Sequence, residues 1–133
     1  MSRILLDTSA YSAFRRGHAE IVREVQEAEQ IVLGSVVLGE LLAGFARGTK
    51  QDDNRSDLRA FLASGRVQIA DVDAETAQRY AVIVESLARA GTPIPTNDIW
   101  IAACAMQHGL RLVTTDAHYK RVPQVLLTFH EME

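Results

Sequence analysis

Short, almost uninterrupted apolar runs alternate along this chain with longer stretches in which apolar residues recur every three or four positions. Apolar runs with little polar alternation are typical of strands that are buried on both faces of a sheet. The runs cover residues 3–7, 31–33, 67–70, 110–115 and about 125–128. Strands that alternate with helices predict a parallel sheet with right-handed crossovers.

The stretches between the predicted strands carry the periodicity of helices with one apolar face. These helices are expected at about residues 9–16, 19–29, 35–47, 58–63, 74–90 and 99–107. The helix that ends at Ala90 is expected to bury one set of apolar residues: Ala77, Tyr80, Ala81, Val84, Leu87 and Ala88. The polar, turn-rich segment 48–57 predicts a mobile loop. We find no internal repeat or domain boundary, so residues 1–133 are predicted to form one α/β domain.

The segment from Pro95 to Asp116 organises this prediction. Thr96 and Asn97 precede an Ala-rich apolar run and favour a helix start, because their side chains can cap free backbone N–H groups. About ten helical residues climb roughly 15 Å, and a six-residue strand returns roughly 20 Å. Asp98 and Asp116 should therefore lie at the same edge of the sheet.

Two more acids are expected at that edge. Asp7 follows the first predicted strand, and Glu40 lies within the helix after the second. Carboxyl ends of parallel strands and amino ends of the following helices share one edge, where open α/β proteins keep their sites. Four converging carboxylates are costly without a counter-ion, and hard oxygen ligands suit Mg²⁺ or Mn²⁺. Such an ion supports hydrolysis of phosphodiester bonds.

Three of these acids also have ordinary structural explanations. An Asp after a strand often caps a helix or forms a turn, as Asp7 and Asp116 could, and Asp98 in a first helical turn is favoured by the helix dipole. Glu40 has no such explanation, since an unpaired carboxylate among apolar residues is expensive. The histidines do not show the i, i+4 spacing of a helical metal site. The four acids together favour a carboxylate metal site.

The order of these pieces resembles the PIN domain, and the compact length resembles the VapC-type ribonuclease toxins of toxin–antitoxin pairs. The pieces are Asp7-Thr8-Ser9, Glu40, Asn97-Asp98 and Thr114-Thr115-Asp116. The resemblance covers essentially the whole chain. It implies a three-layer α/β/α fold with a central parallel sheet in strand order 3-2-1-4-5. It further implies a Mg²⁺- or Mn²⁺-dependent endoribonuclease that cuts RNA, a homodimer, and a cognate small antitoxin protein.

The resemblance also suggests roles for individual residues. The four acids match the family's catalytic and metal-binding positions: Asp7, Glu40, Asp98 and Asp116. Thr8 or Ser9, and Thr115, match the hydroxyls that orient an acid or a water. Asn97 matches a frequent neighbour of the third acid. His118-Tyr119 stands where many relatives carry an aromatic residue after the last acid.

Composition changes this picture in two respects. The formal net charge of −3 at first argues against a nucleic-acid partner, but a metal site would concentrate the negative charge in one place. The single cysteine, Cys104, excludes an intramolecular disulfide and a Cys-rich zinc site. With no signal peptide and no membrane span in the sequence, a cytoplasmic protein is expected.

Two other functions compete with the nuclease. The first is a PIN-fold module that binds RNA or a protein without cutting, which a cleavage assay with divalent metal would separate from the nuclease. The second is a phosphatase or phosphoacceptor of another α/β family, but Asp7-Thr8-Ser9 lacks the second Asp of the Asp-x-Asp signature and no Lys follows the late strands in a suitable place.

The expected antitoxin would need a docking surface. The helices from Ser9 to Arg47 carry more apolar residues than two short strands can cover, and such a surface suits an amphipathic helix. The candidate contact residues are Val36, Val37, Leu41 and Phe45. A basic side chain of the antitoxin could then reach Asp7 or Asp116.

Overall fold

A computed structural model of the chain describes residues 2–132. One sheet of five parallel strands runs through it, in the order β3-β2-β1-β4-β5. The strands are β1 (Arg3–Leu6), β2 (Gln30–Gly34), β3 (Val67–Ala70), β4 (Arg111–Thr114) and β5 (Leu126–Phe129). The predicted strands and the predicted order 3-2-1-4-5 are confirmed.

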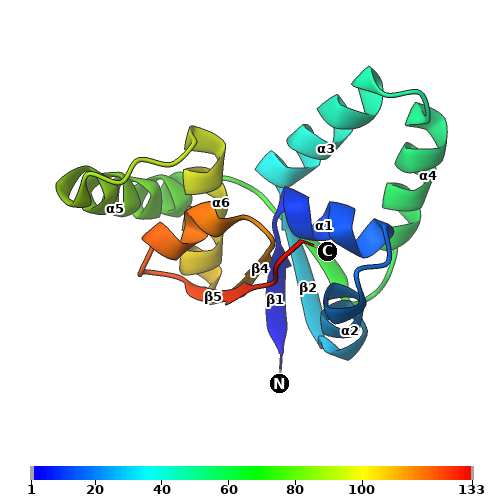
Figure 1. The fold of residues 1–133 in the computed structure, drawn as a ribbon, viewed down its shortest axis with the longest axis horizontal. Coiled ribbons are helices and arrows are strands. Elements are labelled where there is room, and N and C mark those ends of the chain that lie inside the picture. The colour runs from blue at the N-terminus through cyan, green and yellow to red at the C-terminus, as the bar shows by residue number, and fades with distance from the viewer. Residues whose placement is uncertain (1, 133) are drawn as a thin grey trace.

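Helices cover both sides of this sheet. They are α1 (Thr8–Arg15), α2 (Ala19–Glu27), α3 (Ser35–Arg47), α4 (Gln51–Leu62), α5 (Ala74–Ala90), α6 (Thr96–His108) and the short 3₁₀ helix η1 (Ala117–Arg121). In Figure 1, α5 and α6 lie on one side of the sheet and α1 to α4 on the other. Right-handed crossovers explain this division, because the chain moves outward from β1 to β3 and then returns past β1 to β4. The fold is therefore the three-layer α/β/α arrangement.

The centre of the core lies where the two inner strands meet the helices. Leu5 and Leu6 of β1 and Leu112 and Val113 of β4 are fully buried. On the α5–α6 side, Ala102 and its small neighbours are buried as well, so that α6 can pack closely on the strands. The uninterrupted apolar runs of the sequence therefore correspond to strands that helices cover on both faces of the sheet.

The segment 48–57 differs from the prediction of a mobile loop. Helix α4 begins at Gln51 and takes in most of that segment. Asp52 and Asp53 lie in its first turn, where carboxylates interact favourably with the helix dipole. Leu58 is buried and the Phe61 ring packs edge-on against Tyr11 of α1 at 5.3 Å, so apolar contacts distant in sequence tie this helix to the domain, and the exposed pair of Asp57 with Arg15 adds to them.

The buried face of α5 also differs from its prediction. Its buried residues are Thr76, Ile83 and Leu87, and only Leu87 belongs to the predicted set. Four members of that set are exposed instead: Ala77, Ala81, Val84 and Ala88. The prediction was wrong because α5 carries two apolar stripes and packs against α6 with only one of them. The other stripe stays exposed.

The caps of two helices bear on the site. Asp7 is the N-cap of α1, and its side chain accepts from the backbone N–H of Ala10. Helix α6 starts after Pro95, and no side chain caps it. Within residues 2–132, no helix combines the length and the apolar character needed to cross a membrane.

Candidate functional site

The carboxyl ends of β1 and β4 form the switch point of the sheet. From β1 the chain turns toward β2, whereas β4 continues toward β5 on the opposite side. Crevices of open α/β sheets occur at such points, where successive crossovers diverge. Asp7 follows β1 here and Asp116 follows β4, while Asp98 lies in the first turn of α6.

Asp7 is held rigidly at the floor of this edge. Only 3% of it is exposed, and its carboxylate accepts from Ser9 Oγ at 2.8 and 2.9 Å, Ala10 N at 2.8 Å and Thr114 Oγ1 at 2.6 Å. Burial is the main reason why the pKa of Asp7 is raised to about 6, and the nearby Asp116 adds to the rise, although the three donors oppose it. The site therefore holds a carboxylate whose charge lacks a counter-ion.

Thr114 connects Asp7 with Asp116. Besides donating to Asp7, its hydroxyl oxygen accepts from the backbone N–H of Asp116 at 2.9 Å. Ser9 supports the same turn, because its Oγ accepts from the backbone N–H of Thr115 at 3.0 Å. Of the hydroxyls expected to orient an acid, that of Ser9 donates to Asp7, and the Thr114 hydroxyl, which was not expected, donates to it as well.

Asp98 faces this turn from α6. Its Oδ1 accepts from the buried Tyr119 hydroxyl at 3.2 Å, and its Oδ2 lies 3.2 Å from His118 Nδ1. The pKa of Asp98 is raised, first by burial and then by the charge of Asp116. The pKa of Tyr119 is raised as well, by burial and by the carboxylates around it, so its hydroxyl remains a donor.

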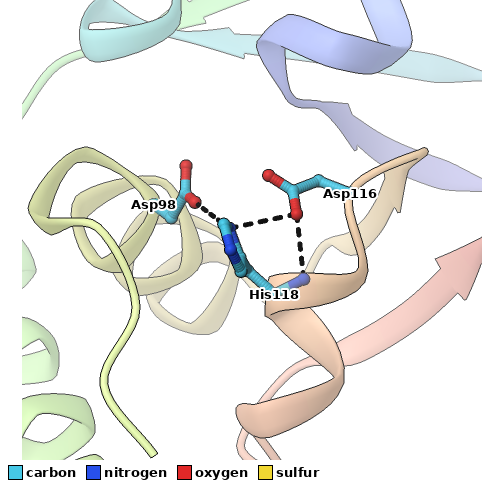
Figure 2. A group of neighbouring side chains, drawn as sticks. All are labelled: Asp98, Asp116 and His118. Carbon is cyan, nitrogen blue, oxygen red and sulfur yellow. Dashed lines mark hydrogen bonds and ion pairs between the residues drawn. The ribbon is translucent and has the colours of Figure 1, made fainter.

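Figure 2 shows that His118 points between Asp98 and Asp116. Its Nδ1 is 3.2 Å from Asp98 Oδ2 and 3.1 Å from Asp116 Oδ1. These three side chains form the one set of His, Cys, Asp and Glu within residues 2–132 whose possible ligand atoms all lie within 4.8 Å of one another. Helical spacing could not reveal His118, but an Asp-x-His pattern directly after a strand is the signal that could have.

Glu40 lies near these residues but outside that set. Its Oε1 accepts from Thr8 Oγ1 at 2.5 Å, and its Oε2 accepts from Asn97 Nδ2 at 3.2 Å. Thr8 and Asn97 are the direct neighbours of Asp7 and Asp98 in the chain, so two bridges tie Glu40 to the same edge. Glu40 is therefore paired and half-exposed, rather than an isolated carboxylate in an apolar setting.

A surface hollow of about 500 Å³ opens beside Glu40. It is lined by Val36, Gly39, Glu40, Ala43, Arg47 and Asn97. Arg47, in the last turn of α3, is exposed and brings positive charge to its wall. A polyanion that enters this hollow would meet a cation next to the carboxylates.

The donor set fits a divalent cation. Asp98 and Asp116 present hard oxygen ligands at a partly exposed edge, and the raised pKa values of Asp7 and Asp98 indicate negative charge that a cation would compensate. An open site of carboxylates is the environment in which Mg²⁺ and Mn²⁺ bind with waters in the remaining positions.

Comparison with known proteins gives consistent results. The PIN domain family matches residues 4–125. The chain is 34% identical over 98 residues to Ribonuclease VapC2 of Rickettsia felis, which covers 73% of this chain and 72% of that protein. Among solved structures, VapBC2 from Rickettsia felis bound to a promoter DNA fragment has a TM-score of 0.83 at 27% identity, covering 95% of this chain and 97% of that one.

A second solved structure extends the likeness to nearly the full length. DNA-bound VapBC from Salmonella typhimurium has a TM-score of 0.84 at 26% identity and covers 97% of this chain and 98% of that one. Family match, sequence identity and fold agree with one another. The chain therefore belongs to the PIN domain family and, within it, groups with the VapC ribonucleases.

Proposed function

We propose that this chain is a divalent-metal-dependent endoribonuclease that acts as the toxin of a toxin–antitoxin pair in the cytoplasm. The observation that carries the proposal is the cluster of Asp98, Asp116 and His118 at the switch point of the sheet, to which the Thr114 hydroxyl connects Asp7. Membership among the VapC ribonucleases supports RNA as the substrate.

Asp7, Asp98 and Asp116 would hold the ion, which is Mg²⁺ or Mn²⁺ in this proposal. When bound, such an ion supplies a water of lowered pKa and stabilises charge on a phosphoryl oxygen. The chain's contribution is preorganisation. Hydrogen bonds from Ser9 and Thr114 fix Asp7, and the Tyr119 hydroxyl fixes one oxygen of Asp98. Little reorientation is then needed when substrate arrives.

Glu40 is the fourth member of the proposed site. Thr8 and Asn97 hold its two oxygens, and it faces the hollow that Arg47 also lines. In that place its carboxylate can accept a proton from the attacking water while Arg47 binds a phosphate of the RNA backbone.

The test is cleavage of RNA by the purified chain with Mn²⁺, with excess EDTA, and after Mn²⁺ is restored. We expect cleavage that EDTA abolishes and Mn²⁺ recovers. Undiminished cutting in EDTA would overturn the metal mechanism. Binding of RNA without any cutting in Mn²⁺ would instead favour the non-catalytic module.

The antitoxin surface needs revision from the sequence prediction. Val37 and Leu41 belong to the core, at 0% and 4% exposure. Phe45 remains half-buried and lines a hollow of about 170 Å³ among α1, α3 and α4, together with Tyr11 and Arg15. The Tyr11 hydroxyl is buried there without a hydrogen-bond partner. We place the docked antitoxin helix over this hollow.

Co-expression from the native locus tests the partner. The expected result is a complex of the chain with a small protein, and growth arrest when the chain is produced alone. A chain that purifies alone and leaves growth unchanged would remove the toxin role while the nuclease role could stand.

The exposed apolar stripe of α5 supports self-association. Ala77, Ala81, Val84 and Ala88 recur at helical spacing on that stripe, and Val84 is 37% exposed. We propose that a second copy covers it in a homodimer. Light scattering should give twice the mass of one chain for the wild type and a single mass for Val84→Glu; a wild-type monomer would contradict the dimer.

A further inference from the structure

In the metal-free chain the ring of His118 pairs with Asp98 and Asp116, and the nitrogen that does so is also where an ion bound by both carboxylates would be met. Its ring nitrogen Nδ1 touches one oxygen of Asp98 and one of Asp116, at 3.2 and 3.1 Å. The ring is 41% exposed, compared with 14% for the Asp98 side chain. It points between the two carboxylates (Figure 2) and, at this exposure, is accessible to an entering ion.

The turn around Asp116 does not need the imidazole. The backbone N–H of His118 donates to Asp116 Oδ1 at 2.9 Å and caps η1. Any residue other than proline would supply the same N–H. The ring contacts are an addition to this cap.

The distances match those between ligands of one ion. Two ligands at right angles on an octahedral ion, each about 2.1 Å from it, lie about 3.0 Å apart. The separations from Nδ1 to the two carboxylate oxygens are close to that value. All three atoms lie within 4.8 Å of one another, so small side-chain movements suffice to bring them around one ion.

We propose that His118 is a nitrogen ligand of the metal ion and that it biases the site toward Mn²⁺ over Mg²⁺. This inference rests on the proposed metal-dependent function. Imidazole binds first-row transition metals well, whereas Mg²⁺ prefers oxygen ligands and keeps its waters. A site with Asp98, Asp116 and His118 as ligands should therefore discriminate between the two ions more strongly than a site of carboxylates alone.

The experiment compares wild type, His118→Gln and His130→Gln as purified full-length chains. His130 is the matched control, because its ring also lies against carboxylates, with Nδ1 2.6 Å from Glu20 Oε2 and Nε2 3.4 Å from Glu24 Oε2, and both of these belong to α2 rather than to the proposed ligands. One readout is the dissociation constant of Mn²⁺ and of Mg²⁺ by calorimetry. The other is the ¹⁴N coupling of bound Mn²⁺ in pulsed electron paramagnetic resonance.

We expect ¹⁴N coupling in the wild type and in His130→Gln, and its loss in His118→Gln. Affinity for Mn²⁺ should fall at least about tenfold in His118→Gln, since even residues that only support a ligand change metal affinity by about 10–100-fold. Affinity for Mg²⁺ should fall less. Absent coupling in the wild type, or equal losses for both ions, would overturn the proposal.

The outcomes separate this proposal from the proposed function. Cleavage of RNA with Mn²⁺ but without ¹⁴N coupling would remove His118 from the ligands and leave the nuclease intact. Coupling that depends on His118, in a chain that cuts no RNA with any ion, would keep the ligand and remove the nuclease. Thermal melts of both variants confirm that each is folded before its metal binding is measured.

Discussion

Two groups of acidic residues in this molecule differ in how their negative charge is compensated. At the switch point, Asp98 and Asp116 lie together and Thr114 connects Asp7 to them; among the described residues their basic contact is His118, with no arginine or lysine paired to them. At the other group, Arg111 donates to both oxygens of Glu24, at 2.7 and 3.1 Å.

The pKa values report this difference. Burial and neighbouring carboxylates raise the pKa of Asp7 and of Asp98. Hydrogen bonds from Arg111, followed by those of His130, lower the pKa of Glu24. The second group holds its own counter-charges and ties α2 to β4 and β5, because Arg111 also donates to Thr128. The first group holds buried negative charge at an energetic cost, which is typical of a site that binds a cation.

The largest expected effect is the opposite response of the two groups to neutral substitutions. Asp98→Asn should lower RNA cleavage at least about a hundredfold, or about 3 kcal/mol of transition-state stabilisation. Its melting temperature in EDTA should be unchanged or slightly raised, because a repulsive charge is lost. Glu24→Gln should do the reverse: keep cleavage and lower the melting temperature. Cleavage that survives in Asp98→Asn with reduced stability would make Asp98 structural.

The second effect is the pH dependence that Asp7 contributes in the metal-free chain. Its folded pKa of about 6 lies above its usual value of 3.8. Protonated Asp7 therefore contributes to the unfolding free energy below about pH 4, and this contribution is lost as pH rises through about 6. The loss amounts to about 3 kcal/mol. In denaturant titrations with EDTA, the unfolding free energy of Asp7→Asn should rise relative to that of the wild type as pH increases across this window. Parallel curves for the two proteins would contradict the raised pKa.

The third effect comes from removing the counter-charge at the second group. Arg111→Met keeps most of the length of the side chain but leaves Glu24 without its bidentate partner. We expect a loss of about 2 kcal/mol in unfolding free energy, since both side chains are largely buried. Cleavage should stay within twofold of the wild type. Stability that is unchanged in urea melts would show that the pair contributes no net energy.

The smallest effect sharpens the description of Asp98. Tyr119→Phe removes one donor to Asp98 and fills the same buried space. Stability should fall by about 1 kcal/mol, and cleavage should fall only severalfold, because His118 and the position on α6 still place the carboxylate. A loss as large as that of Asp98→Asn would mean that the tyrosine takes part in the chemistry directly.

Local sequence was a good guide wherever the environment is the same all along an element. The strands could be predicted because β1, β2 and β4 are covered on both sides, so that nearly every position is apolar. It failed for the start of α4, whose polar residues resemble a loop, because the buried Leu58 and the contact of Phe61 with Tyr11 anchor the helix only in the folded domain. It failed for α5, because two apolar stripes compete and only packing against α6 selects one.

The sequence by itself determined that this protein is a parallel α/β domain and that Asp7, Glu40, Asp98 and Asp116 lie toward one edge, because hydrophobic period and element length are local properties of the chain. Only the tertiary structure decided how those acids are used. It buried Asp7 beneath the Thr114 hydroxyl, held Glu40 between Thr8 and Asn97, and placed His118 between two carboxylates. These relations join residues up to 107 positions apart, and only the packing of separate elements around the switch point brings such residues together.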